Sequence, residues 1–435
     1  MSAAPTAART RTLILGGAVS GRAAARLAVR LDHDVIVYDR DEAAVADLGL
    51  GVAAVGGEWD RRLLRDRDLV VTSPGIPQDA SPIVDSLAAG IRFISEMEFG
   101  FQHLDSTCVA VTGTNGKTTV TATAAAMLDA SGYDAIAAGN IGLALSDVAG
   151  AGHQVVVVEA SSFQLRFIDT FHPVAAAILN IAPDHLDWHG SLSAYAAAKR
   201  RIGENQDPGD IIVYDADDAA AAAAVAGFAA RPIPVSGSRR PPTGNGPEGD
   251  ELRIGDVSVP RPALDNAFTM DLTAAATLAQ HLGASPEAIG SVIAGFVTEV
   301  HRRTVIGEWG GVAWINDSKA TNPHAALCAA AAYESVVLIA GGRNKGLDLT
   351  ALAQAPSVRI LIALGEATDE LRAATPPDRF YPADSLAHAV AVADEMAVAG
   401  DTVLLAPGCA SFDMFADYRE RGRIFTALVS QRKGT

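Results

Sequence analysis

The stretch TGTNGKTT, residues 112–119, decides the fold of the middle of this chain. The apolar run 108–111 before it predicts a strand, and the alanine-rich run 120–130 after it predicts a helix. A glycine turn between a strand and a helix places backbone N–H groups and the positive end of the helix dipole around an anion. Lys117 can then reach the terminal phosphates of a nucleotide, and the hydroxyl of Thr118 can bind the accompanying Mg²⁺.

The match to the complete phosphate-loop motif lacks one glycine. Val111 stands where that motif carries its first glycine, so the agreement is with the core pattern G-x-x-G-K-T. The alternative is an ordinary glycine turn that caps a helix. The order of strand, glycine turn, lysine and helix favours the phosphate site.

Length and charge limit the classes of protein that this chain can be. A chain of 435 residues with 49% apolar residues is long enough for several buried cores. The net charge of −17 disfavours general binding to nucleic acid or to anionic membranes. Because salt screens distant carboxylates beyond about 8 Å, a phosphate site here requires local cations near its glycine turns.

The sequence predicts a cytoplasmic protein. Residues 1–11 contain no apolar segment of the kind found in signal peptides, and apolar runs elsewhere end before membrane-spanning length. Cys108, Cys328 and Cys409 lie far apart without a C-x-x-C pair. This spacing argues against a disulfide framework or a zinc site.

The N-terminal part predicts a nucleotide-binding topology. Residues 13–38 suggest a strand, a glycine turn at 16–21, a helix and a second strand that ends in Asp39. The pattern is close to the dinucleotide-binding fingerprint, but Ala18 replaces its middle glycine. Three interpretations are open: an NAD site, a ligand-free Rossmann-like scaffold, or a site for a nucleotide such as a UDP group. The loop 73–77 ends another predicted strand, where parallel sheets bind ligands, although proline and glycine also form plain turns.

Acidic and imidazole side chains follow two predicted strands of the central part. Glu159 ends the apolar run 155–158, where a carboxylate beside a phosphate site can bind Mg²⁺; a solvated strand end is the alternative. Residues 180–189 place carboxylates and imidazoles after the next strand, and these groups suit Mg²⁺ or its waters. The alternative for Asp187 and His189 is capping of the helix that follows.

The helix predicted after residue 189 carries Lys199, which from its place in the sequence alone is interpreted as a surface lysine. The alanine-rich run 217–230 predicts a peripheral helix.

The C-terminal part alternates predicted strands and helices, which favours a second doubly wound sheet. Its loops carry the local cations that a phosphate site requires, although each could also be a solvated surface charge. These cations are Arg302, Lys319, Arg343 and Lys345.

Together these stretches resemble the Mur ligase family. The phosphate loop 112–119 is shared with all Mur ligases and with folylpolyglutamate synthetases. Four further stretches, 159–165, 180–189, 316–322 and 411–415, resemble the branch that adds D-glutamate. They have the forms E-x-S-S-F-Q-L, N-x-x-x-D-H-L-D-W-H, N-D-S-K-A-T-N and S-F-D-x-F.

The resemblance implies an α/β fold of three domains. These are a Rossmann-like UDP-substrate domain at 1–104, a central P-loop ATPase domain with a parallel sheet at 105–299, and a Rossmann-like amino-acid-binding domain at 300–435. The implied activity is ATP-dependent ligation of D-glutamate to UDP-N-acetylmuramoyl-L-alanine, through an acyl phosphate, in peptidoglycan precursor synthesis. A monomer without nucleic-acid or membrane partners is expected.

The resemblance also implies roles for individual residues. Lys117, His185 and Lys199 would be catalytic, with Lys199 carbamylated by CO₂. Two Mg²⁺ ions would be bound by Thr118, Glu159, His185 and carbamylated Lys199. ATP would be bound by Gly113, Thr114, Asn115, Gly116, Lys117, Thr118, Thr119, Asn266, Arg302, Asp317 and Lys319. The other substrates would be bound by Gly17, Ser20, Asp39, Arg40, Ser73, Pro74, Gly75, Asn140, Ser161, Gln164, His185, Thr321, Lys345, Ser411, Phe412 and Tyr418.

The chain departs from the family pattern at the helix expected to contact adenine. Asp265 and Asn266 replace a His-Asn pair, and Thr269 replaces a later asparagine. The rival functions are another Mur-type or L-glutamate-adding ligase, a folylpolyglutamate synthetase-like ligase, an NAD-dependent oxidoreductase, and a non-enzymatic nucleotide switch.

Overall fold

The computed structural model describes residues 9–431, and the chain is mixed α/β with several parallel sheets. Residues 1–8, part of the stretch in which the sequence predicts no signal peptide, lie outside the described residues, as do residues 432–435. The chain divides into two compact units: residues 1–181 with 193–295, and residues 182–192 with 296–435. Between residues 9 and 431, no helix is both long enough and apolar enough to cross a membrane.

The first unit begins with a five-stranded parallel sheet in the order β3-β2-β1-β4-β5. This order places the glycine turn after β1 at the centre of the sheet. The strands are β1 (Arg11–Leu15), β2 (Asp34–Asp39), β3 (Ala53–Gly56), β4 (Leu69–Thr72) and β5 (Arg92–Ser95). The helices are α1 (Val19–Arg30), α2 (Glu42–Val45), η1 (Arg61–Leu64), α3 (Ser81–Ala88) and α4 (Glu96–Phe101).

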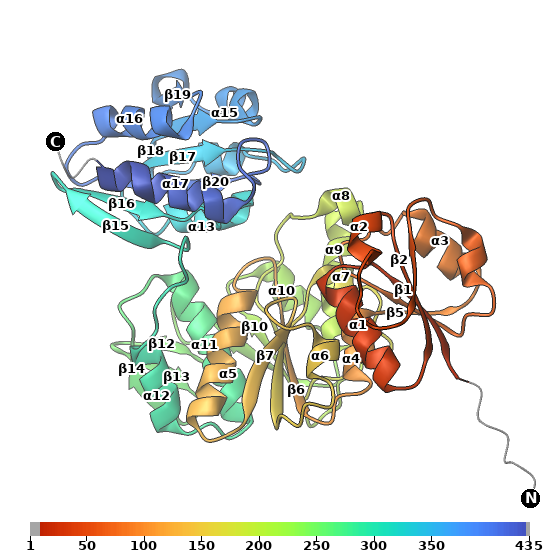
Figure 1. Cartoon of the computed structure of the whole chain (residues 1–435). Helices are drawn as coiled ribbons and strands as arrows, with labels where there is room; N and C mark the ends of the chain where they lie inside the picture. Colours follow the sequence, from red (N-terminus) through yellow and green to blue (C-terminus); the bar gives the residue numbers. More distant parts are fainter. Residues whose placement is uncertain (1–8, 432–435) are drawn as a thin grey trace, which may run out of the picture. The chain divides into compact units, whose positions relative to one another are not determined.

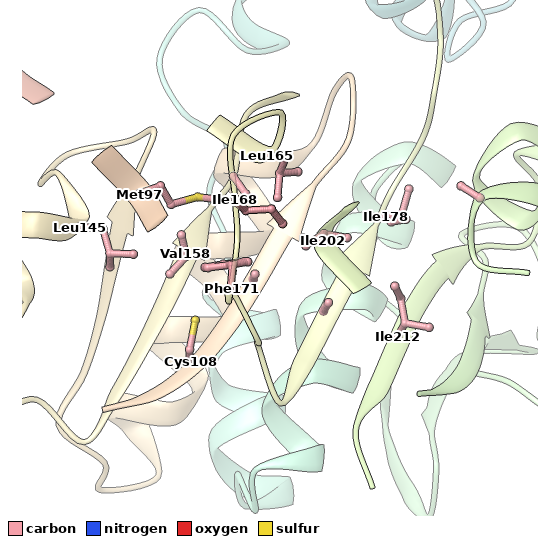
Figure 2. Close-up of a cluster of buried hydrophobic side chains, with 14 of the residues drawn as sticks. Met97, Cys108, Leu145, Val158, Leu165, Ile168, Phe171, Ile178, Ile202 and Ile212 are labelled. Carbon is pink, nitrogen blue, oxygen red and sulfur yellow. The ribbon is translucent and has the colours of Figure 1, made fainter. Parts of the chain in front are cut away.

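A six-stranded parallel sheet follows in the order β11-β10-β9-β6-β8-β7. Its strands are β6 (Thr107–Thr112), β7 (Ala135–Gly139), β8 (Val155–Glu159), β9 (Ala175–Ile178), β10 (Ile211–Asp215) and β11 (Arg231–Val235). The central strands are apolar because helices cover both faces of a parallel sheet. Figure 2 shows part of one face, where Val158, Phe171, Ile178 and Ile202 belong to one buried cluster.

The helices of this part are α5 (Lys117–Ala130), α6 (Leu145–Val148), α7 (Ser162–Leu165), α9 (Leu192–Arg200), η2 (Arg201–Gly203), α10 (Ala219–Ala224), α11 (Asn266–His281) and α12 (Pro286–Ala294). The two long helices α5 and α11 pack side by side (Figure 1). A small antiparallel sheet joins β12 (Gly246–Glu248), β13 (Glu251–Ile254) and β14 (Val257–Pro260), and β13 and β14 form a hairpin around Gly255.

The predicted helix over 217–230 is wrong in extent. Only α10 is helical, and the chain then forms β11, a strand at the edge of the sheet. Asp218 caps α10, and Gly227 takes a left-handed φ of 82° soon after the helix ends. Pro232 and Pro234 are compatible with β11 because an edge strand leaves one side of its backbone without ladder hydrogen bonds.

The second unit contains a six-stranded sheet in the order β15-β16-β20-β17-β18-β19, parallel except for β15. Its strands are β15 (Thr304–Trp309), β16 (Val312–Asn316), β17 (Val336–Gly341), β18 (Val358–Leu364), β19 (Phe380–Pro382) and β20 (Thr402–Gly408). Its helices are α8 (Leu186–His189), α13 (Pro323–Ala330), α14 (Thr350–Ala353), α15 (Thr368–Ala374), η3 (Pro377–Arg379), α16 (Leu386–Met396) and α17 (Tyr418–Gln431).

A buried carboxyl group lies where the first sheet meets the central sheet of the same unit. Glu96 at the start of α4 is 1% exposed, and its Oε1 accepts a 2.7 Å hydrogen bond from the backbone N–H of Ser146 on α6. Its Oε2 has no hydrogen-bond partner among the described residues. Burial raises the pKa of Glu96 to about 7, although the hydrogen bonds from Ser146 act in the opposite direction.

We expect Glu96 to make folding stability depend on pH. Because its pKa is higher in the folded state than in the unfolded state, its contribution is fully present below about pH 4.5 and is lost as the pH rises through about 7. The full loss corresponds to about 3 kcal/mol. Urea unfolding of wild type and Glu96→Gln should differ increasingly between pH 5 and pH 8, whereas exposed Glu287→Gln should give a constant difference. Parallel pH profiles for wild type and Glu96→Gln would contradict this expectation.

Candidate active site

The phosphate loop joins β6 to α5 in the first unit. β6 ends at Thr112 and α5 begins at Lys117, which confirms the predicted order of strand, glycine turn and helix, although the helix begins three residues before the predicted 120. Gly116 takes the N-cap position of α5 with a left-handed φ of 87°, which glycine adopts without strain. Because glycine has no side chain, this N-cap offers no oxygen to compete with an anion for the first N–H groups of the helix.

The end of β9 holds this loop in place. The backbone N–H groups of Thr114 and Asn115 donate to the carbonyl and the Oδ1 of Asn180, at 2.9 and 2.8 Å. The Nδ2 of Asn180 donates back to the carbonyl of Asn115 at 3.1 Å. Asn180, the first residue of the polar motif 180–189, therefore positions the phosphate loop.

Lys117 lies over its own loop. Its Nζ donates to the carbonyls of Gly113 and Thr114 at 2.9 and 3.0 Å. These are neutral acceptors, so a phosphate group would offer the ammonium stronger, charge-assisted hydrogen bonds. The side chain is thus held close to where a bound phosphate would lie.

The interpretation of Lys199 as a surface lysine is wrong, because the residue is 1% exposed. α9 carries it beneath the phosphate loop, where Nζ donates to the carbonyl of Gly113 at 2.6 Å. Nζ also lies 4.5 Å from the centre of the Tyr195 ring, whose hydroxyl is 3.2 Å from the hydroxyl of Thr114. Burial of a charged lysine costs free energy, so its position against the phosphate loop favours a functional role.

Glu159 lies beside the phosphate loop because β8 pairs with β6, in a register that aligns Glu159 with Val111. The side chain is 3% exposed, and its Oε1 accepts a 2.9 Å hydrogen bond from the Nδ2 of Asn140. Its Oε2 is buried with no hydrogen-bond partner within residues 9–431. A buried carboxylate oxygen in this state fits direct binding of a hard cation such as Mg²⁺.

Ser161 and Gln164 form the capping box of α7. The Ser161 hydroxyl accepts from the Gln164 N–H at 3.2 Å, and the Gln164 Oε1 accepts from the Ser161 N–H at 3.0 Å. Gln164 is 1% exposed. Both side chains thus have a local structural role in addition to the substrate role that the family resemblance implies.

The glycine turn of the first sheet borders a cavity of about 830 Å³. Asp39, Arg40 and Gly75, for which the family resemblance implies substrate binding, line it together with Tyr38 and Trp59, which the sequence analysis did not single out. The rings of Tyr38 and Trp59 pack edge to face with 4.9 Å between their centres. Gly17, Ser20, Ser73 and Pro74 do not line it.

The turn is nevertheless connected to Asp39. The Oδ2 of Asp39 accepts a 2.7 Å hydrogen bond from the N–H of Gly17. Ser73 approaches Gly16 so closely that a Cβ at Gly16 would lie 2.5 Å from the Ser73 hydroxyl. Arg22 donates to the carbonyls of Gly17, Ala44 and Asp47, so its guanidinium holds the loop together.

The helix expected to contact adenine is α11. Asp265 caps it, Asn266 is its exposed first residue, and the Thr269 hydroxyl donates to the carbonyl of Asp265 at 2.8 Å. Sequence reasoning missed Asp271 on the next turn. Its Oδ1 would lie 2.3 Å from a Cβ at Gly116, so this buried carboxylate directly adjoins the phosphate loop.

The predicted metal set is divided between the two units. Thr118, Glu159 and Lys199 belong to the first unit, whereas residues 182–192, including His185, belong to the second. His185 has a left-handed φ of 53° and is the N-cap residue of the four-residue helix α8. Asp187 and His189, for which capping of the following helix was the alternative interpretation, are part of α8 itself.

Asp184, which sequence reasoning did not single out, is the best-connected side chain of this segment. It is 5% exposed; its Oδ1 lies 3.0 Å from the Nζ of Lys345, and its Oδ2 accepts from the Nδ2 of Asn322 at 3.1 Å. Burial alone would raise the pKa of Asp184, but the charges of Lys345 and His185 outweigh it and lower that pKa. The ion pair and the hydrogen bond connect residues 182–192 to the two loops of the second unit that carry Lys345 and Asn322.

We expect Asp184→Asn to lower the free energy of unfolding of the second unit by about 2 kcal/mol, because it leaves the partly buried Lys345 without its carboxylate. The contribution of Asp184 should also be lost as the pH falls through its lowered pKa. Denaturant unfolding at pH 7 checks the first point. Glu366→Gln, which breaks the exposed pair with Arg343, is the matched control and should change nothing measurable.

The polar loops of the second unit follow the carboxyl ends of β16, β17 and β20. Asp317 is 5% exposed and accepts from the N–H of Arg303 at 3.2 Å. Lys319 forms an ion pair with Glu299. Two residues for which the resemblance implies substrate binding differ in exposure: Ser411 is 2% exposed, whereas Phe412 is 66% exposed.

Comparison with protein families identifies two regions of the chain. Residues 111–237 match the Mur ligase middle domain, and residues 301–409 match the glutamate ligase domain of Mur ligases. A solved pseudomurein peptide ligase type C from Methanothermus fervidus aligns with a TM-score of 0.61 at 16% identity, covering 97% of this chain and 99% of that one. A solved MurF from Acinetobacter baumannii aligns with a TM-score of 0.60 at 16% identity, covering 85% and 93%. These structures support the fold.

Curated relatives are closer in sequence. A UDP-N-acetylmuramoylalanine--D-glutamate ligase from Frankia casuarinae is 41% identical, covering 97% of this chain and 94% of its own length. A protein of the same name from Pelotomaculum thermopropionicum is 36% identical, covering 98% and 99%. Similarity of this extent, together with the phosphate loop and the buried Glu159 beside it, shows that the chain belongs to the Mur ligase family, in its branch of UDP-N-acetylmuramoylalanine--D-glutamate ligases.

Proposed function

We propose that this chain is an ATP-dependent ligase that joins D-glutamate to UDP-N-acetylmuramoyl-L-alanine in peptidoglycan precursor synthesis. The observation that carries the proposal is the 41% identity, over 97% of the chain, to a curated ligase of that name. The phosphate loop, the cavity beside Asp39 and the polar loops of the second unit supply sites of the kind that three such substrates require.

Amide formation in water requires activation of the carboxylate. Transfer of the γ-phosphoryl group of ATP to the substrate carboxylate gives an acyl phosphate, and the amine of D-glutamate then attacks the carbonyl carbon and releases phosphate. Negative charge accumulates on the transferred group, so catalysis depends on placing cations and N–H donors around it. Lys117 and the N-terminus of α5 are suited to this task.

Two Mg²⁺ ions would neutralise phosphate charge and hold the transferring group in line. The free buried oxygen of Glu159 fits this role, as does the hydroxyl of Thr118 at the start of α5. Lys199 fits as a carbamate formed with CO₂, because its nitrogen would keep one N–H for the carbonyl of Gly113 while the new carboxylate-like group binds metal. His185 is the fourth ligand by resemblance to the family.

The cavity bordered by Asp39 and Gly75 would bind the UDP group. Its volume of about 830 Å³ accommodates a nucleotide, and Tyr38 and Trp59 offer aromatic surface to a base or sugar. The Nδ2 of Asn140, held by Glu159, would direct the muramoyl substrate toward the phosphate loop. Thr321, Lys345 and Ser411 would bind the amino acid.

We further propose three domains, each built on one of the three large sheets. They are a Rossmann-like domain at 1–104, a P-loop ATPase domain at 105–299 and a second Rossmann-like domain at 300–435. The enzyme acts as a monomer. It works in the cytoplasm, where ATP is abundant.

The deciding experiment measures ADP release with UDP-N-acetylmuramoyl-L-alanine and each glutamate enantiomer. We expect release with D-glutamate only, dependent on both substrates. Release with L-glutamate would indicate an L-glutamate-adding variant, and release with a folate substrate would indicate a folylpolyglutamate synthetase-like enzyme. ADP release without any amino acid or muramoyl substrate would contradict the ligase proposal.

A further inference from the structure

Arg421 is a buried cation with only neutral partners. It lies on the first turn of α17 and is 2% exposed. Its Nε and Nη2 donate to the hydroxyl and carbonyl of Ser318, at 3.0 and 2.9 Å, and its Nη1 donates to the carbonyl of Cys409 at 3.3 Å. Within residues 9–431, no carboxylate lies within 4.0 Å of its guanidinium.

The side chain lies where three loops of the second unit meet. It is bonded to the loop after β16 through Ser318 and to the loop after β20 through Cys409. A Cβ at Gly342, in the loop after β17, would lie 3.4 Å from its Nη1. Backbone bonds connect the loops further, since Gly408 N–H donates to the Ala320 carbonyl and Arg343 N–H donates to the Ala410 carbonyl, both at 2.9 Å.

These loops carry the residues proposed to bind the amino acid: Thr321, Lys345 and Ser411. The more accessible cations beside them already have carboxylate partners. Lys345 pairs with Asp184, Lys319 with Glu299, and Arg343 with Glu366. The charge of Arg421 is therefore the one that has no carboxylate in contact within residues 9–431, and Asp413 acts on it only from beyond ion-pair distance.

Burial of a guanidinium without a carboxylate disfavours the folded state. Burial lowers the pKa of Arg421 to about 10, against the opposing effect of Asp413, so the group still carries its charge at neutral pH. A cation retained at this cost under three substrate-side loops is explained if an anionic ligand binds above it. A purely structural cross-link between loops would need the hydrogen bonds but not the charge.

We infer that Arg421 is a specificity-determining positioning residue, whose buried charge makes the amino-acid site select a substrate with a second carboxylate over its neutral amide. The inference rests on the proposed function, and it deepens that function by naming the charge that sets the amino-acid class. Because Arg421 is buried, it acts through its electric field and through Ser318 and Cys409, without touching the substrate. Low polarity around the guanidinium strengthens that field.

The test compares Arg421→Met with Arg421→Lys in the full chain. Both variants lose the fork of hydrogen bonds to Ser318 and Cys409, but only Arg421→Met loses the charge. Two readouts are measured: the ratio of kcat/KM for D-glutamate to that for D-glutamine, and the inhibition constant of glutarate, a dicarboxylate without the amine. The KM for ATP and the thermal midpoint serve as internal controls.

In Arg421→Met we expect the glutamate-to-glutamine ratio to fall at least tenfold and the glutarate inhibition constant to rise at least tenfold. The KM for ATP should change less than twofold. Arg421→Lys should keep both selectivity values within threefold of wild type, despite a lowered thermal midpoint. Equal losses in the two variants, with an unchanged ratio, would overturn the inference and leave Arg421 as a structural cross-link. If Arg421→Met does not fold, neutral Arg421→Gln is used with the same criteria.

The amino-acid preference of the wild-type enzyme distinguishes a failure of this inference from a failure of the proposed function. If it ligates a different dicarboxylic amino acid and Arg421→Met, unlike Arg421→Lys, loses the preference for that acid over its amide, the D-glutamate assignment fails and the inference about Arg421 holds. If it ligates D-glutamate and both Arg421 variants keep wild-type selectivity, the function is supported and the inference fails. If it prefers a neutral amino acid, both fail.

Discussion

Lys117→Ala should reduce substrate-dependent phosphate release by about three orders of magnitude, the scale on which removal of one essential charge-stabilising donor acts. The lysine Nζ lies over the phosphate loop, 2.9 Å from the carbonyl of Gly113, and it would exchange this neutral acceptor for the transferring phosphoryl group. The loss should appear mainly in kcat, because the charge of that group is greatest in the transition state. Steady-state assays with all three substrates measure it.

The same variant should remain folded. In the absence of nucleotide, the Nζ of Lys117 donates two hydrogen bonds to backbone carbonyls, each worth about 1 kcal/mol, which is less than the free energy of unfolding of a typical domain. Arg166→Ala, which removes an exposed cation from the same unit, should keep full activity. Substantial turnover by a folded Lys117→Ala protein would show that the phosphate loop does not serve the reaction.

The alternation of apolar runs with glycine-containing turns was sufficient to predict the parallel sheets and the strand ends that carry polar loops. The prediction from this pattern failed where the structure of a segment depends on its position in the fold and not on its local composition. Six consecutive alanines form only the short helix α10, and β11 contains two prolines that a central strand would exclude. An edge position makes β11 possible, and edge positions depend on strand order, which local patterns do not specify.

The relative positions of candidate site residues could be predicted where they follow directly from a motif at the end of a strand. The phosphate loop and Glu159 are of this kind, because strand pairing between β6 and β8 was enough to bring them together. Contacts between distant segments could not be predicted. The Asp184–Lys345 pair joins residues 161 positions apart, and Asp271 reaches Gly116 only because α11 packs beside α5. Burial of Lys199 likewise depends on how α9 docks against the loop.

Lys199→Ala should lower turnover at least about 100-fold, because it removes the group proposed to hold the second Mg²⁺. The sign of the charge at this position is the informative quantity. As an ammonium, Lys199 would add positive charge beneath the phosphate loop; as a carbamate, it would add negative charge and require a metal ion beside it. Lys199→Arg separates the two states, since an arginine keeps the positive charge but does not form the carbamate. We therefore expect Lys199→Arg to be nearly as inactive as Lys199→Ala.

Carbon dioxide provides an independent measurement on the unmodified protein. Removal of CO₂ should lower wild-type turnover and added bicarbonate should restore it, whereas Lys199→Ala should respond to neither treatment. Enrichment with ¹³CO₂ should give a carbamate carbon signal in wild type that the alanine variant lacks. Because Lys199 is 1% exposed, the carbamate should exchange slowly once formed, so depletion requires prolonged dialysis. Wild-type activity that is indifferent to CO₂, together with an active Lys199→Arg variant, would mean that the buried lysine works as an ammonium and that Glu159 binds metal without it.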